Sequence, residues 1–159
     1  MAWAGTVPAR EVIAQHTPGK AVAMPFSEWE PELDASYPAQ PSQVPAIRRA
    51  VAEVARARGA EQHTVVQITL AVSEAATNAV LHAYRGPAAD RPGDVRVVVR
   101  AEDESALIVQ VRDHGIGPLP RSDSPGLGLG MSLMAHDADA FEIRPVPEGG
   151  TEVVLRFEL

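Results

Sequence analysis

The chain has 159 residues, enough for one domain with a substantial buried core. Its formal net charge is -7, so the chain as a whole has no electrostatic attraction to nucleic acid or to an anionic membrane. It contains no cysteine, which excludes disulfides, thiolate metal sites and a cysteine nucleophile. We recognise neither an apolar run of membrane-spanning length nor a signal peptide, and we therefore expect a soluble cytoplasmic protein.

The first part of the chain is rich in proline. Prolines at positions 8, 18, 25 and 31 interrupt every apolar period before it is established. We therefore expect residues 1–31 to be a loosely ordered N-terminal extension and residues 32–159 to form the folded domain. Three aromatic residues of the extension could dock on another surface, namely Trp3, Phe26 and Trp29.

The domain is predicted to begin with a strand and a helix. Residues 33–37 alternate between apolar and polar and predict an edge strand that Pro38 closes. Ser42 is the expected N-cap of a helix that Gly59 ends. Four arginines lie on the exposed side of this helix. The four are Arg48, Arg49, Arg56 and Arg58. We interpret them as a solvated face, and a contact surface for an acidic partner is the less favoured alternative.

A second helix is predicted from about residue 63 to residue 84, where Ala and Leu are frequent and Gly and Pro are absent. Glu74, Asn78 and His82 are spaced by four residues, so they stack along one side of it. Most of the remaining circumference is apolar and wide enough to be buried. Taken alone, these three residues are interpreted most simply as a solvated stripe. A carboxylate one turn from a carboxamide can also supply a base and oxygen ligands for Mg²⁺.

The remaining elements are mainly strands. Alternating, β-branched sequence predicts strands at 95–100, 107–112, 141–144 and 151–157, and a short helix is predicted at 131–136. Two helices therefore precede antiparallel strands with one glycine-rich crossover. This order predicts the α+β class, as a two-layer α/β sandwich with a mixed, mostly antiparallel sheet and helices on one face.

Two glycine-containing motifs could support chemistry. Asp113 ends a predicted strand and is followed by Gly115 and Gly117. A carboxylate there can accept a hydrogen bond from an exocyclic amine, and the glycines let the backbone approach a flat ring. Asp-x-Gly-x-Gly is nevertheless common in ordinary turns.

The second motif is a glycine loop before the helix expected at 131–136. Backbone N–H groups and a helix N-terminus together favour a phosphate, although a plain flexible loop explains the glycines equally well. Neither the dinucleotide fingerprint nor the P-loop is present. The glycines concerned are Gly126, Gly128 and Gly130.

The order of the motifs is more specific than any one of them. Glu-x-x-x-Asn on a helix, Asp-x-Gly-x-Gly after a strand, a glycine loop before a helix and Gly-Gly-Thr before the last strand resemble the GHKL ATPase superfamily. The resemblance covers residues 33–159, and it implies the Bergerat ATP-binding fold. The sequence of residues 73–84 looks most like that of the stand-alone bacterial anti-sigma factor serine kinases.

The resemblance also implies roles for single residues. Asn78 would ligate the Mg²⁺ that bridges the phosphates of ATP, and Glu74 would be the general base. Asp113 would bind the adenine amino group. His82 would either contact the nucleotide or pack beside Tyr84. The other implied contacts are Gly115 and Gly117 around the base, Gly126, Gly128 and Gly130 around the phosphates, and Thr151 near the adenine.

The function that the resemblance implies is an ATP- and Mg²⁺-dependent serine kinase. It would bind a sigma factor, phosphorylate an anti-sigma antagonist on serine, and form a homodimer as such kinases tend to do. One alternative is a non-catalytic module in which ATP selects the conformation that a partner recognises. A second alternative is a detached ATP-binding domain of a histidine kinase. This alternative is weaker because we see no dimerisation helix with a phosphoacceptor His before the domain.

Overall fold

The computed structural model describes residues 30–83, 93–117 and 127–159, and it describes the backbone but not the side chains of His82 and of residues 127–131. The expected extension, 1–31, lies outside the described residues except for its last two, and Pro31 already belongs to the first strand. In chain order the elements are β1 (Pro31–Pro38), the 3-10 turn η2 (Pro41–Gln43), α2 (Val44–Ala57), α3 (Gln62–His82), β2 (Asp94–Ala101), β3 (Ala106–Asp113), α4 (Leu127–Asp137), β4 (Ala140–Pro145) and β5 (Thr151–Glu158).

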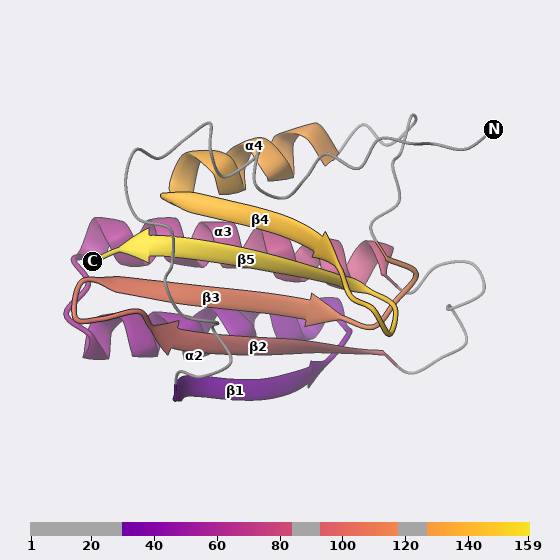
Figure 1. Ribbon diagram of the computed structural model, residues 1–159, viewed down its shortest axis with the longest axis horizontal. Coiled ribbons are helices and arrows are strands. Elements are labelled where there is room, and N and C mark those ends of the chain that lie inside the picture. Colours follow the sequence, from indigo (N-terminus) through magenta and orange to yellow (C-terminus); the bar gives the residue numbers. More distant parts are fainter. Residues whose placement is uncertain (1–29, 84–92, 118–126) are drawn as a thin grey trace.

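The strands form one sheet in the order β1-β2-β3-β5-β4 (Figure 1). Each of the four neighbouring pairs is antiparallel, so the described sheet is antiparallel throughout, whereas we had expected a mixed, mostly antiparallel sheet. β2–β3 and β4–β5 are hairpins. The connection from β3 passes through α4 to the edge strand β4, so that β5 returns between β4 and β3. The prediction of an edge strand at 33–37 is confirmed, because β1 pairs only with β2 among the described strands.

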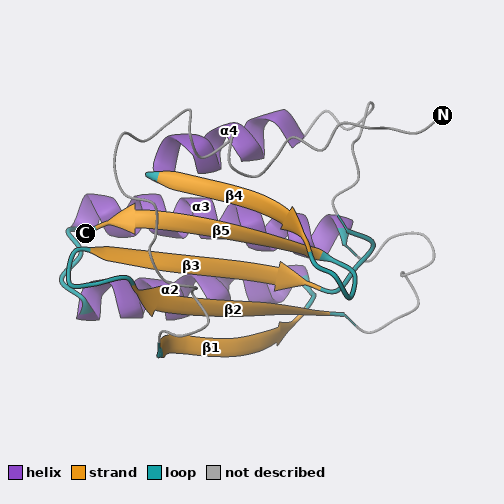
Figure 2. Cartoon of the chain, viewed as in Figure 1, coloured by secondary structure: helices purple, strands orange, loops and turns teal. Residues whose placement is uncertain are grey.

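The helices form a second layer on one side of the sheet (Figure 2). We call the side of the sheet that faces them the inner face and the opposite side the outer face. The strands alternate between them: Val95, Val97 and Val99 of β2 belong to the buried core, whereas Arg96 and Arg100 lie on the outer face. The predicted two-layer α+β sandwich with helices on one face is therefore confirmed.

The long helix α3 forms the centre of the helical layer. By length and composition alone, its residues Gln62–Leu81 could cross a membrane. Ile68, Ala71, Val72 and Ala76 are nevertheless each 0% exposed within the core cluster. The helix is apolar because it packs against both the sheet and its neighbouring helices, which is the usual reason in a small domain.

Two predicted helix boundaries were wrong. Ser42 does not cap α2, because it lies inside the turn η2, and the N-cap position is held by Gln43 without a side-chain hydrogen bond. The helix begins at Val44, and Pro45 is its second residue, where a fixed φ suits the first turn. The predicted end is confirmed: Gly59 lies just beyond the C-cap residue Arg58 with a φ of 83°. The second wrong boundary, that of α4, concerns the site and is described with it.

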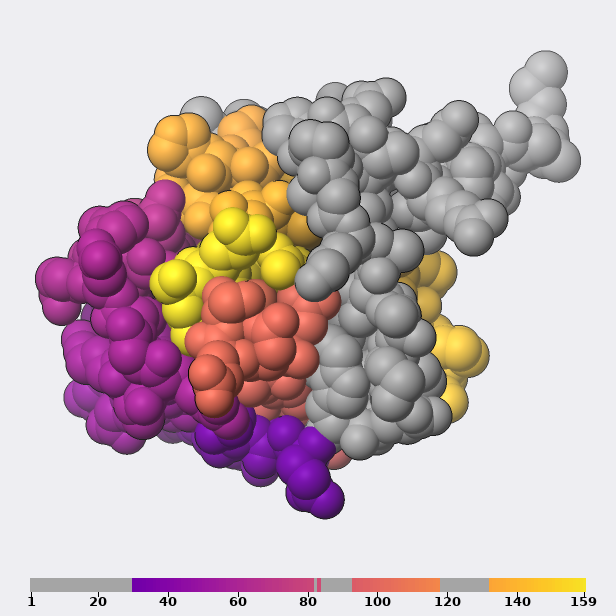
Figure 3. Space-filling view, turned by 60° about the vertical axis from the view of Figure 1, so that its left-hand side comes forward, coloured from indigo at the N-terminus to yellow at the C-terminus, as the bar shows by residue number. Residues whose placement is uncertain are grey.

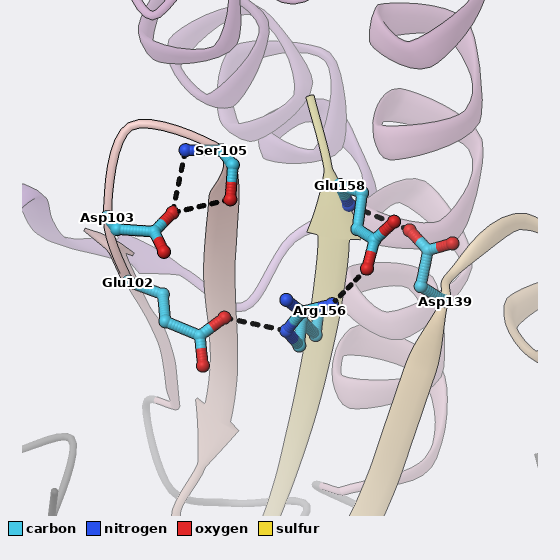
Figure 4. Close-up of polar contacts among 6 residues, drawn as sticks. All are labelled: Glu102, Asp103, Ser105, Asp139, Arg156 and Glu158. Carbon is cyan, nitrogen blue, oxygen red and sulfur yellow. Dashed lines mark hydrogen bonds and ion pairs between the residues drawn. The ribbon is translucent and has the colours of Figure 1, made fainter. Parts of the chain in front are cut away.

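The two ends of the sheet differ. At the hairpin end, where β2 turns into β3, Arg156 donates to Glu102 (2.7 Å) and to Glu158 (3.1 Å), and the Glu158 backbone N–H donates to Asp139 (2.7 Å) (Figure 4). In Figure 3 the molecule is turned so that this end comes forward, and the helices lie to one side of the strands. The predicted site residues of the strands lie at the other end, which we call the site end.

Candidate functional site

Asp113 is the buried acid of the site end. It is the last residue of β3 and pairs in register with Val95, which places its side chain on the inner face, where it is 5% exposed. Its Oδ1 accepts two backbone hydrogen bonds, from the N–H of Gly115 (2.9 Å) and from the N–H of Thr151 (3.2 Å). The second oxygen, Oδ2, accepts none from the described residues, and it is free to accept one from a ligand.

The environment of Asp113 opposes its ionisation. Burial raises the pKa of Asp113 above its ordinary value, and the two backbone hydrogen bonds, together with the charge of the neighbouring His114, lower it again without cancelling the rise. A carboxylate held in an unfavourable environment by its backbone surroundings is a common feature of binding and catalytic sites.

The turn between β4 and β5 brings Thr151 to this carboxylate. Gly149 and Gly150 in the turn have φ of 100° and 106°, values that side chains rarely allow. The turn is closed by hydrogen bonds from Val146 N–H to Gly150 O (3.1 Å) and from Gly149 N–H to Val146 O (2.9 Å). A Cβ on Gly150 would stand 2.0 Å from the carbonyl oxygen of Asp113, so only glycine fits there.

The end of α3 is fixed to the loop that follows Asp113. The Ile116 N–H donates to the carbonyl oxygen of Ala83 (2.9 Å), immediately after the last residue of the helix. A Cβ on Gly115 would stand 2.0 Å from that same oxygen, so the loop can reach the helix only with glycine at this position. Gly117, with a φ of 84°, lies next to the glycine turn, where its Cβ would be 3.5 Å from Gly150 O. The backbone contacts therefore fix α3 relative to Asp113.

Glu74 and Asn78 lie one turn apart on α3. Both are half-buried, while Ala75 and Ala79 beside them belong to the core. Within the described part of the chain, neither side chain has a hydrogen-bond or ion-pair partner. They therefore form a carboxylate and a carboxamide that a ligand can still use, on the helix whose end contacts the Asp113 loop.

The structure places the remaining predicted site residues less completely. His82 is the last residue of α3, its side chain lies outside what is described, and Gly126 lies outside as well. Gly128 and Gly130 were expected in a loop before the helix, but α4 already begins at Leu127, so both are helical. They lie in the first turn of α4, where backbone N–H groups have no partner within the helix and favour an anion.

The backbone groups that assemble the site were not predicted. These are the carbonyl oxygens of Ala83 and Asp113 and the N–H of Ile116, which contact segments distant in sequence. The only sequence signal for them was glycine itself, in the Asp-x-Gly-x-Gly motif and in Gly149-Gly150, which we had used as part of the Gly-Gly-Thr motif without assigning it these contacts. The two histidines His114 and His136, which we had expected to be solvated, have exposed side chains (45% and 80%).

Comparison with known proteins adds an independent line of argument. The family model of the histidine kinase-like ATPase domain matches residues 37–157. The serine-protein kinase RsbW of Bacillus licheniformis is 30% identical over 137 residues, which is 77% of this chain and 82% of the relative. The anti-sigma F factor of Pasteuria penetrans is 38% identical over 100 residues, 56% of this chain and 65% of the relative.

A solved structure shows the same fold. The histidine kinase domain of the blue-light activated kinase from Erythrobacter litoralis superposes with a TM-score of 0.52 at 21% identity, covering 94% of this chain and 69% of that one. Asp113, the glycine turns and the Glu74–Asn78 helix lie within the matched range. The chain belongs to the histidine kinase-like ATPase domain family and, within it, to the group of the anti-sigma factor serine kinases.

Proposed function

We propose that this protein is an ATP- and Mg²⁺-dependent serine kinase that binds a sigma factor and phosphorylates an anti-sigma antagonist. The observation that carries the proposal is Asp113, a buried carboxylate with one oxygen engaged by two backbone N–H groups and the other free of described partners. The family membership supports ATP as the phosphate donor, and the names of the relatives support serine kinase activity and a sigma factor as partner.

The Asp113 end of the site suits the base of ATP. Oδ2 would accept a hydrogen bond from the adenine amino group, whereas a keto oxygen in the same place would meet a second acceptor. Gly115 lies directly against the backbone of Ala83, and Gly150 lies directly against the backbone of Asp113, with no side chain in between. The Thr151 N–H donates to the same carboxylate, so the side chain of Thr151 would lie near the base.

The residues on α3 suit the phosphate end. The described residues contain no group of three His, Asp or Glu side chains that could hold a metal by themselves. This fits Mg²⁺, which commonly takes one or two protein oxygens and completes its shell with water and substrate phosphates. The carboxamide oxygen of Asn78 would be the protein ligand, and the ion would neutralise phosphate charge. The first turn of α4, with Gly128 and Gly130, would contribute backbone N–H groups.

Glu74 is the proposed base. Its carboxylate would accept the proton of the substrate serine hydroxyl as the serine oxygen bonds to the γ-phosphorus and the bond from that phosphorus to the β,γ-bridging oxygen breaks. ADP is the leaving group. The contact between Ala83 and the Asp113 loop would keep Glu74 at a fixed distance from the bound base, so that positioning contributes much of the rate.

The proposed partners place the protein in the cytoplasm, where sigma factors act. A homodimer is proposed as well, because the kinases that this chain resembles tend to dimerise. These statements rest on the proposed function and on the resemblance to the anti-sigma factor serine kinases.

The proposal is tested by incubating the protein with radiolabelled ATP, Mg²⁺ and candidate antagonist proteins from the same organism. We expect label on a serine of one antagonist, abolished by EDTA and lost in Glu74→Ala. Transfer that continues at the same rate in Glu74→Ala would remove the assigned base. The absence of any change in melting temperature with Mg-ATP would contradict the whole proposal, since a ligand at about a hundred times its Kd stabilises a fold by about 2.7 kcal/mol.

A further inference from the structure

The turn between β4 and β5 is held to the end of β3 on both faces of the sheet. The register between β3 and β5 ends at the pair Arg112–Glu152, so the turn lies beyond the last paired residues. On the inner face, the N–H of Thr151, which follows the turn, donates to Oδ1 of Asp113 (3.2 Å). On the outer face, Nη2 of Arg112 donates to Oε2 of Glu148 in the turn (2.9 Å). Two consecutive residues of one strand therefore hold the turn from opposite sides.

Arg112 contacts the turn although the register offers it a closer acid. Glu152 of β5 lies directly across from Arg112 on the same face. The Oε2 of Glu152 accepts instead from Nε of Arg144 on β4 (2.6 Å). On its other side Arg112 pairs in register with Arg96 of β2, a residue of like charge. The arrangement of charges on the outer face therefore directs the guanidinium of Arg112 to Glu148.

The other contacts of the turn do not attract it to β3. Its two backbone hydrogen bonds, between Val146 and Gly150 and between Gly149 and Val146, are internal to the turn. Gly149 and Gly150 lie close to the backbone at Gly115 and Asp113, but such contacts exclude a side chain without providing a directional bond. A hydrogen bond between two charged groups is directional and is stronger than one between neutral groups. The Arg112–Glu148 pair is thus suited to keep the turn in place.

The position of the turn determines the orientation of Asp113. Oδ1 accepts from the Gly115 N–H in its own loop (2.9 Å) and from the Thr151 N–H beyond the turn. Burial raises the pKa of Asp113, and both backbone donors oppose that rise. If the turn moved away, the carboxylate would keep only the Gly115 N–H and could rotate about it. Oδ2, the oxygen without a described partner, would then lose its fixed direction.

We propose that Arg112 and Glu148 are positioning residues for the nucleotide base, a role that rests on the proposed function. Their ion pair keeps the turn against β3, the turn keeps the Thr151 N–H on Asp113, and Oδ2 is thereby directed at the adenine amino group. The pair lies on the outer face, so it acts through Asp113 and not by contact with the nucleotide. The side chains of Arg112 and Glu148 are 28% and 71% exposed, so the pair affects local opening of the turn more than global stability.

The first test uses the chain without nucleotide. Amide hydrogen exchange at Thr151 is measured by NMR in Arg112→Gln, in Glu148→Gln and in the double variant. We expect exchange to be at least about fivefold faster in each single variant and no faster still in the double variant, because the two residues act as one pair. Exchange at Val109, in the middle of β3, should not change, since it reports global unfolding. The matched control is Arg96→Gln, which removes an ion pair of the same face that does not reach the turn. Unchanged exchange at Thr151 in Arg112→Gln, or additive effects in the double variant, would overturn the proposal.

Nucleotide binding supplies the second test. Purine riboside triphosphate lacks the amino group that Oδ2 of Asp113 would accept. By calorimetric titration we expect Arg112→Gln and Glu148→Gln to lower the affinity for ATP about threefold to fivefold and to leave the affinity for purine riboside triphosphate unchanged. An equal loss for both triphosphates would indicate a general structural effect and would overturn the proposal. If the natural chain bound neither triphosphate, the proposed function would fail, while the exchange rates would still decide whether the pair holds the turn.

Discussion

The two ends of the candidate site are built in different ways. The Asp113 end is made of backbone. Two N–H groups bind Oδ1, and backbone segments that are distant in sequence approach so closely that Gly115 and Gly150 have no room for a Cβ. The α3 end is made of two side chains, Glu74 and Asn78, that lie half-buried on a helix and have no partner in the described part of the chain. Where contacts between backbone segments form a site, as at Gly115 and Gly150, a substitution of those glycines changes fold and binding together. Where projecting side chains form it, chemistry can be removed without loss of fold.

The largest effect is expected from Gly115→Ala. The new Cβ would stand 2.0 Å from Ala83 O, a backbone atom that cannot move without displacing the end of α3. We expect a loss of at least about 3 kcal/mol in the free energy of unfolding and no detectable ATP binding. Urea unfolding and calorimetric titration measure the two quantities.

The matched control for this prediction is Gly59→Ala. Gly59 also has a positive φ, 83°, but a Cβ there would have nothing within 4 Å. Only the backbone strain remains, about 1 kcal/mol, with normal ATP binding. If both alanine variants were equally stable, the close approach of the loop to Ala83 would be contradicted.

At the α3 end, Glu74→Gln should separate chemistry from fold. Removal of a general base typically lowers the rate of transfer by about 10²- to 10⁴-fold, while a half-buried isosteric change without lost partners alters stability by no more than about 0.5 kcal/mol. Single-turnover phosphotransfer, ATP titration and urea unfolding test the three parts. Glu53→Gln, on the exposed side of α2, is the control. If Glu74→Gln lost ATP affinity as strongly as rate, Glu74 would be a binding residue and not the base.

Asp113→Asn should affect binding with little cost to the fold. The asparagine can still accept the N–H groups of Gly115 and Thr151 through its oxygen, but it presents an amide donor to the adenine amino group in place of Oδ2. We expect ATP affinity to fall by about 100-fold, equivalent to about 2.7 kcal/mol, with an unfolding free energy equal to or above that of the natural chain. An unchanged Kd for Mg-ATP would place the adenine elsewhere.

The same division explains what the sequence could predict. Asp113, Glu74 and Asn78 were identified because the order of the motifs that contain them resembles that of the GHKL ATPase superfamily; taken alone, Glu74 and Asn78 were interpreted as a solvated stripe. Their spacing predicts which side of a helix or which end of a strand they occupy. The contacts of Ala83, Ile116 and Gly150 were not predicted because any residue has a backbone carbonyl and N–H. Such contacts depend on how segments distant in sequence approach one another.

The helix α4 shows a related limit. Its Leu-Gly-Leu-Gly start has poor helix propensity, so we predicted a loop up to residue 130, yet the structure has a helix from Leu127. Packing of Met134, which is fully buried, and of the rest of α4 against α3 outweighs the local preference. Strand positions were predicted within about two residues because alternation is a local property, whereas the pairing order of the strands was not read from the sequence.

The smallest effect is a difference in the pH dependence of stability between two aspartates. Burial raises the pKa of Asp113, so the folded chain binds its proton more tightly than the unfolded chain does. Ionised Asp113 therefore lowers stability at neutral pH, and this penalty is relieved as the pH falls through the raised pKa towards about 3.8. Any excess stability of Asp113→Asn over the natural chain should shrink in that window, on a scale of about 1.4 kcal/mol for every tenfold difference in proton affinity.

Asp34 on the outer face should behave with the opposite sign. Its hydrogen bonds from Arg96, at 2.8 and 2.7 Å, lower the pKa of Asp34, so its contribution is present above a pH of about 3.8 and is lost as the pH falls through the lowered pKa. Asp34→Asn should therefore be less stable than the natural chain near neutral pH, by less than about 1 kcal/mol because the pair is exposed. Urea unfolding between pH 7 and about 3 measures both variants. If Asp113→Asn and Asp34→Asn differed from the natural chain with the same sign at neutral pH, the contrast between a buried carboxylate held by backbone N–H groups and an exposed, ion-paired one would not hold.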